Sequence, residues 1–378
     1  MDFELSADQE LLRESLRRFL SERAPITPYV RDRLSSAVHV GAVLDDPVWL
    51  GLAEMGLLGL LVGEEHGGAG MGMVDAAVVL EELGRAVCPA PFVASAIGAI
   101  SAVCGAGGAS DQASLLPGLA AGTSVGAVAL FEAGRRWSWD TPDTNASVAD
   151  GKWTVSGEKV HVADGAAASL FVVSARVAGG LALFTVDRDA AGVDVATTPS
   201  VDGTRGDATV RFTDAPARPL NTDDAVARST IATVLDRMGV ADVVDGVGAA
   251  ARALELAVDY AKERVQFDRP IGSFQAVQHL CADMLRTVEL GRAAAYYACW
   301  ASGAADATEA HRAATLACAF AADAFPQLGG TAIQIFGGIG FTWEHDIHLY
   351  FKRLLSQSIR FGTADTHLAA LASQILTP

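Results

Sequence analysis

The hydrophobic pattern of this chain changes its period twice, and these changes constrain the fold more than any other feature. Before about residue 119 and after about residue 222, apolar residues recur at the three- and four-residue spacing of amphipathic helices. In between lie short runs rich in β-branched residues, separated by turns that contain Gly and Asp, which is typical of strands. This order of elements favours separate layers over alternating βαβ units.

We therefore predict an α+β fold with three domains. Residues 1–119 form a helical domain, residues 120–221 a small antiparallel β domain, and residues 222–378 a four-helix bundle. A capping box at Ser6 and Gln9 begins the first helix. The expected strands are Val125–Phe131, Trp153–Val162, Leu170–Ser174, Leu181–Asp187 and Thr209–Thr213. The expected bundle helices are Gly248–Arg264, Phe274–Trp300, Asp306–Phe336 and a segment after Glu344.

Composition narrows the class of function. The formal net charge of −17 argues against nucleic acids and anionic membrane surfaces as partners. No uninterrupted apolar run reaches about 18 residues, so we expect no membrane span. The opening MDFELSADQE has acids where a signal peptide needs basic and apolar regions, so we expect a cytoplasmic protein. The five scattered cysteines lack CxxC spacing and predict buried thiols, with no metal site.

The segment Gln334–His367 carries the most information about function. It joins the end of a helical pattern to a glycine turn and a second amphipathic helix, in which Lys352 and Arg353 lie on the polar side. The glycines of Gly337–Gly340 allow a tight turn and close approach to a bulky ligand. Taken alone, they fit either a cofactor-facing turn or an ordinary corner between helices.

Two longer blocks extend this observation. QIFGGIGFTWEHD and YAKERVQFDRPIGSFQAVQHLCADM resemble the two signatures of the acyl-CoA dehydrogenases, in the same order and at a fitting spacing. GEEHGGAG near the N-terminus is also similar to that family, so the resemblance covers essentially the whole chain. It implies an FAD enzyme that oxidises an acyl-CoA thioester to the α,β-enoyl-CoA. It also implies electron transfer to an electron-transfer flavoprotein, and a homodimer or tetramer whose subunits share the FAD site.

The resemblance implies which residues hold the flavin. Carried over by motif, the expected FAD contacts in the bundle are Arg264, Gln266, Phe267, Gln334, Gly338 and Thr363. Gln334 and Gly338 match contacts that this family supplies across a dimer. In the β domain the match is weaker, because Phe131 stands at the position of the usual hydroxyl residue and His161 at that of the usual tryptophan. Each could instead be a strand residue packed within the sheet.

The catalytic base is the main departure from the family. Desaturation needs a desolvated carboxylate to take the α-proton. Most members carry this glutamate at the position of Phe361 and a minority at about Met238, and neither residue is an acid here. We name Asp245 as the candidate base, ahead of Asp242 and Asp236, because it lies in an apolar run on the same helix as Met238. The alternative is that Asp245 only extends a polar stripe of that helix.

Three interpretations remain open from the sequence. The leading one is a self-sufficient FAD-dependent acyl-CoA dehydrogenase. The alternative is a catalytically silent subunit that completes the FAD site of a homologous, base-carrying partner in a hetero-oligomer. Relatives of the second kind act on sterol side chains. A helical scaffold without a cofactor is the third interpretation, and it leaves the QIFGGIG block unexplained.

Overall fold

The computed structural model of the chain describes residues 5–34, 40–135 and 137–376. It divides into two compact units. The first, here called the bundle unit, is made of Met1–Asp32, Ala77–Cys88 and Gly239–Pro378. The second, here called the β unit, is made of Arg33–Ala76 and Pro89–Met238. Three helices contribute to both units, namely α2 (Arg31–Leu34), α5 (Met73–Arg85) and α8 (Asp224–Glu263).

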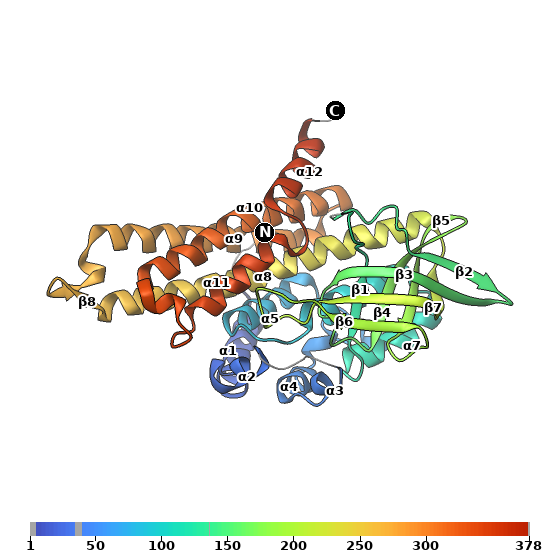
Figure 1. Ribbon diagram of the computed structural model, residues 1–378, viewed down its shortest axis with the longest axis horizontal. Coiled ribbons are helices and arrows are strands. Elements are labelled where there is room, and N and C mark those ends of the chain that lie inside the picture. Colours follow the sequence, from blue (N-terminus) through green and yellow to red (C-terminus); the bar gives the residue numbers. More distant parts are fainter. Residues whose placement is uncertain (1–4, 35–39, 136, 377–378) are drawn as a thin grey trace. The chain divides into compact units, whose positions relative to one another are not determined.

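The bundle unit is helical. Its further elements are α1 (Ala7–Arg23), the hairpin β8 (Val265–Gln266) and β9 (Arg269–Pro270), α9 (Gln275–Ala304), α10 (Ala307–Phe336), η6 (Gly337–Phe341), α11 (Ile347–Arg360) and α12 (Ala364–Leu376). Helices α9, α11 and α12 pack against α10, and α8 to α11 run nearly alongside one another in Figure 1. Asp306 begins α10 as its N-cap, because its carboxylate accepts from the N–H of Glu309 at 2.9 Å.

The predicted capping box of the first helix is confirmed. The N–H of Gln9 donates to Ser6 Oγ at 3.2 Å, and the N–H of Ser6 donates to Gln9 Oε1 at 3.0 Å. These two bonds satisfy backbone donors that the first turn of a helix leaves without partners.

The β unit is built around one mixed sheet. Its strands are β1 (Gly126–Ala129), β2 (Asn145–Ala149), β3 (Lys152–Val162), β4 (Leu170–Val177), β5 (Gly180–Asp187), β6 (Val193–Thr197) and β7 (Ala208–Asn221). Strands β4, β2, β3, β7 and β5 pair in that order, and β5 pairs again with β4, so the sheet closes on itself. Large apolar side chains, among them Phe171, Phe184 and Phe212, fill its interior. The helices of this unit are α3 (Val40–Leu44), α4 (Pro47–Glu54), α6 (Ile100–Ala106) and α7 (Ala109–Ala120), with the short turns η3 (Glu64–His66) and η4 (Val93–Ala99).

The predicted fold class is confirmed, with helices before and after a central β region. The expectation of a purely antiparallel sheet is wrong, because β1 pairs parallel with β4, Gly126 opposite Leu170. A parallel pair needs a long connection, and here that connection contains β2 and β3. The domain boundaries at residues 119 and 221 stay a prediction.

Two smaller findings concern the cysteines and the length of the apolar helices. All five cysteines are free thiols, but only Cys88, Cys299 and Cys318 are buried, so the expectation of uniformly buried thiols is wrong for Cys104, which is exposed, and Cys281, which is half-buried. None of the helices within the described ranges is long and apolar enough to cross a membrane.

Candidate functional site

The hairpin after α8 places three of the predicted flavin contacts on the surface of the bundle unit. Phe267 and Asp268 turn the chain with left-handed backbone angles, φ +53° and +63°. Phe267 is thereby 87% exposed, which is unusual for an aromatic ring that has no partner molecule. Gln266 donates from Nε2 to the carbonyl of Val265 at 2.8 Å. The guanidinium of Arg264 is exposed and makes no side-chain hydrogen bond or ion pair within residues 5–34, 40–135 and 137–376.

The glycine corner after α10 lies at the same end of the bundle unit. Gly337 ends the helix with φ +63°, and neither a Cβ on Gly337 nor one on Gly338 would meet any atom within 4 Å. The ring of Phe336 stacks on Tyr260 with centroids 4.4 Å apart, one turn before Arg264. The structure therefore brings the hairpin and the corner together, although 70 residues separate Arg264 from Gln334.

Thr363 lies elsewhere. It follows α11, and its Oγ1 accepts from the N–H of Thr366 at 3.3 Å at the start of α12. The length of α11 separates it from the glycine corner, about 20 Å at 1.5 Å per residue. Thr363 therefore has an observed local role as a helix cap, and its contact with a cofactor stays a prediction.

Asp245, the predicted base, lies in a buried ion pair. Nη1 of Arg353 donates to its two carboxylate oxygens at 3.0 and 3.1 Å, and Nε2 of Gln357 donates to Oδ1 at 2.8 Å. The second guanidinium nitrogen of Arg353 donates to the carbonyl of Cys88 at 3.1 Å. Helix α5 covers the same turn of α8, since a Cβ on Gly84 would lie 1.8 Å from the carbonyl oxygen of Asp245.

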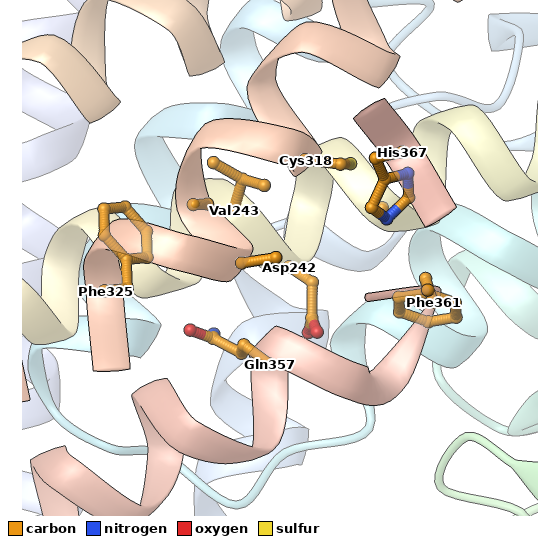
Figure 2. Close-up of a pocket in the computed structure, with 11 residues that line it drawn as sticks. Asp242, Val243, Cys318, Phe325, Gln357, Phe361 and His367 are labelled. Atoms are coloured by element: carbon orange, nitrogen blue, oxygen red, sulfur yellow. The ribbon is translucent and has the colours of Figure 1, made fainter. Parts of the chain in front are cut away.

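Asp242, one turn earlier, repeats this arrangement. Nη1 of Arg360 donates to its Oδ1 at 3.3 Å, and both side chains are 4% exposed. Asp242, Gln357, Phe361 and His367 line a cavity of about 20 Å³, shown in Figure 2. This volume holds little more than one water molecule.

Sequence reasoning missed the arginine partners of these acids. Arg353 was expected on the polar side of α11, but it is fully buried. A signal was present, because Arg353 and Arg360 are seven residues apart and so share a helix face, as do Asp242 and Asp245. Asp346, at the start of α11, accepts from Arg31 of α2 at 2.6 Å. Asp236 lies on the part of α8 that belongs to the β unit and is half-buried.

In the β unit, the two predicted contacts share an aromatic cluster. The ring of Trp137 lies edge-on to Phe131, with centroids 5.2 Å apart, and 5.6 Å from the ring of His161. Phe131 is 5% exposed and lies two residues after the end of β1. His161 has a left-handed φ of +52°, which is uncommon for a residue other than Gly.

The end of the bundle unit fits a flavin dinucleotide. Arg264 supplies an uncommitted cation for phosphate oxygens, Phe267 an exposed ring, and Gly337 and Gly338 an open stretch of backbone. The acids of α8 differ, because each is buried and forms an ion pair with an arginine of α11. The bundle unit therefore has exposed groups that fit a cofactor, while each of its two buried acids is paired with an arginine.

Comparison with known proteins agrees with this picture. Three family models match the chain, described as acyl-CoA dehydrogenase N-terminal domain (residues 6–123), middle domain (residues 127–215) and C-terminal domain (residues 229–376). Acyl-CoA dehydrogenase IpdE2 of Mycobacterium tuberculosis is 33% identical over 92% of this chain and 90% of its own length. Acyl-CoA dehydrogenase FadE34 of the same organism is 33% identical over 93% of this chain but only 45% of its own length. A solved structure, a variant of the Tcur3481-Tcur3483 steroid ACAD, superposes with a TM-score of 0.87 at 30% identity and covers 98% of both chains.

Proposed function

Because the chain belongs to the acyl-CoA dehydrogenase family, whose members are FAD-dependent oxidoreductases acting on CH–CH bonds, we propose that it takes part in the α,β-desaturation of an acyl-CoA thioester. In this proposal the chain is a subunit of a hetero-oligomer. It contributes FAD contacts, and a homologous subunit contributes the carboxylate that takes the α-proton. Electrons then pass from the flavin to an electron-transfer flavoprotein, and the assembly works in the cytoplasm.

One observation carries this proposal. Asp242 and Asp245, the first two candidates for the base, are buried and held by Arg360 and Arg353. Each arginine donates to carboxylate oxygens, and these bonds occupy lone pairs that a catalytic base would use to accept the α-proton. Phe361, at the usual glutamate position, has no acidic group at all.

The relatives support a partner subunit. The solved relative at 30% identity is a steroid ACAD named for two gene products, Tcur3481 and Tcur3483. FadE34 matches this chain over less than half of its own length, so one FadE34 chain has room for two such units. Steroid-derived CoA esters are therefore the substrates to test first, beside straight and branched acyl-CoA esters.

The flavin itself would be held by residues of the hairpin after α8 and of the glycine corner after α10. Arg264 would neutralise phosphate oxygens, while Gly337 and Gly338 leave space for close approach of a cofactor or of the chain that carries it. When bound, FAD supplies the acceptor for the β-hydride. The contacts of Gln266, Phe267, Gln334 and Thr363 with FAD remain part of this proposal.

A second candidate function is the self-sufficient dehydrogenase with Asp245 as its base. The observation in its favour is burial, because Asp245 is only 2% exposed and lies in an otherwise apolar run of α8. A base needs such a desolvated setting. For this function Arg353 and Gln357 would have to release the carboxylate when substrate binds.

Anaerobic flavin reduction separates these functions. The chain is purified alone and also co-expressed with a homologue from the same genome that carries glutamate at the position of Phe361. Each preparation is mixed with straight, branched and steroid-derived CoA esters, and flavin absorbance is followed. We expect flavin in both preparations and bleaching only with the homologue. Bleaching of the lone chain would favour the second candidate, and flavin-free protein in both preparations would overturn the proposal.

A further inference from the structure

Lys159 lies on β3 in the interior of the β unit, where a lysine is rarely found without a partner. Its side chain is 0% exposed. Nζ donates to Glu132 Oε1 at 2.8 Å, to Ser174 Oγ at 3.0 Å and to the carbonyl of Leu130 at 3.2 Å. These acceptors use all three N–H groups of the ammonium, so none is left for a ligand.

Glu132 connects the start of the segment 132–144, which follows β1, to the end of that segment. Its Oε1 accepts from the N–H of Thr144 at 2.9 Å as well as from Lys159, and its Oε2 accepts from the N–H of Asp143 at 2.6 Å. Burial alone would raise the pKa of Glu132, but the charge and hydrogen bonds of its partners lower it to about 2. Burial lowers the pKa of Lys159 to about 8, despite Glu132. The pair therefore ties residues 132–144 to β3.

Both predicted flavin contacts of the β unit are attached to this pair. Phe131 precedes Glu132, and its carbonyl accepts from the N–H of Val160 at 2.9 Å. His161 lies two residues after Lys159 in a bulge, since Lys159 pairs with Val210 and Val162 with Ala208, which leaves two residues of β3 opposite one residue of β7.

We infer that Lys159 and Glu132 are positioning residues for the flavin, which hold the segment after β1 and the β3 bulge so that Phe131 and His161 face the cofactor. The inference rests on the proposed function, because it assigns those two residues to FAD. Lys159 and Glu132 act through their neighbours, since their own polar atoms are used within the β unit. Stability alone is a weak reason for such a pair, because well-packed apolar residues often replace a buried ion pair without loss.

The experiment compares three variants of the protein as purified with its partner. Lys159→Met leaves the Glu132 carboxylate buried without its cation. The double variant Glu132→Gln with Lys159→Met removes both charges. Glu158→Gln is the matched control, because Glu158 is the adjacent residue of β3 and pairs with Arg211 at the exposed surface. For each we measure the Kd for FAD, the visible circular dichroism of the bound flavin, and the urea midpoint of unfolding.

We expect Lys159→Met to weaken FAD binding roughly tenfold or more, because Phe131 and His161 are no longer held in place. The urea midpoint should fall as well, because the Glu132 carboxylate is left buried without its cation. The double variant should regain the midpoint but not the FAD affinity or the flavin dichroism, and Glu158→Gln should match the wild type. If the double variant regains affinity and dichroism together with stability, the pair is merely structural and the inference is overturned. A wild-type protein that binds no FAD would overturn the proposed function, and this inference with it.

Discussion

Nη1 of Arg353 donates to both carboxylate oxygens of Asp245, at 3.0 and 3.1 Å, across 108 residues of sequence. The two side chains are 0% and 2% exposed, so the pair joins α11 to α8 away from solvent. If one charge of a buried pair is removed, the other is left in the interior without compensation, which destabilises the fold. The pair is therefore a sufficient structural reason for an acid in this apolar helix, independent of proton transfer.

Removal of Arg353 should be costly for the fold. Arg353→Met leaves a buried carboxylate without its cation, and we expect the free energy of unfolding to fall by about 3–5 kcal/mol. The double variant Asp245→Leu with Arg353→Met should recover most of this loss, because it leaves no buried charge. Urea unfolding measures both. Arg286→Met on α9, whose ion pair with Asp283 is exposed, serves as control and should change little. Equal, small effects for all variants would show that the buried pair contributes nothing.

A substitution at Phe361 should give the lone chain dehydrogenase activity. Phe361→Glu places a carboxylate where the family carries its base, and we expect the lone chain then to bleach its flavin with acyl-CoA. The rate should exceed that of wild type by at least roughly 100-fold, the usual contribution of a general base. Phe361→Gln has a similar shape without the charge and should stay inactive. A Phe361→Glu protein that holds FAD and never bleaches would mean that a missing base is not what silences the chain.

Removal of the exposed arginine before the hairpin, Arg264, should directly weaken the binding of FAD. Arg264→Ala should raise the Kd for FAD by roughly 10- to 100-fold, because a charge-assisted hydrogen bond contributes about 1.5–3 kcal/mol. The unfolding midpoint should not move, since Arg264 is exposed. Arg286→Ala removes another exposed arginine, from α9, and should leave the Kd as it is. A titration of apo-protein with FAD measures both constants, and equal constants would remove Arg264 from the site.

Acid should destabilise the protein through His348. This histidine is 7% exposed, and within the described ranges neither ring nitrogen finds a hydrogen-bond partner. Burial, followed by the charges of Lys352 and Arg31, lowers its pKa below 6.5. The unfolded chain then binds the proton more readily, so stability falls as the pH drops below about 6.5.

The measurement for this prediction is the urea midpoint between pH 5 and pH 7.5. His348→Phe should flatten part of the decline, because the folded state no longer excludes a proton there. His279→Phe replaces an exposed histidine of α9 and should leave the slope intact. Identical slopes in His348→Phe and wild type would show that other groups cause the decline.

The elements with strong hydrophobic periodicity could be predicted closely. The helix expected over Phe274–Trp300 is α9 (Gln275–Ala304), and the strand expected over Trp153–Val162 is β3 (Lys152–Val162). Strands β2 and β6 were not predicted, because each has only five residues and most of these are exposed. β7 extends eight residues beyond the predicted end at Thr213, through a segment that contains two prolines.

The parts of the candidate site that lie within a sequence motif could be predicted. The contacts between residues far apart in the sequence could not. Arg264 and Gly338 could be named from their blocks, and the structure places both at one end of the bundle unit. The ion pairs of Asp245 and Asp242 join residues 108 and 118 positions apart. Local spacing shows which side chains share one face of a helix. It does not show which side chain of another helix packs against that face. The hydrogen-bond partners of Lys159 could not be predicted for the same reason, because they lie 15 to 29 residues away in the sequence.

The central claim is that the proton acceptor is not supplied by this chain. Its most direct test is the rate of flavin reduction by acyl-CoA in the assembled hetero-oligomer that carries Asp245→Asn, with Asp242→Asn measured in parallel. The account predicts that both variants reduce their flavin within about twofold of wild type, since an amide keeps an acceptor for each arginine. A loss of roughly 100-fold or more in Asp245→Asn, with FAD still bound, would identify Asp245 as the base and contradict the account.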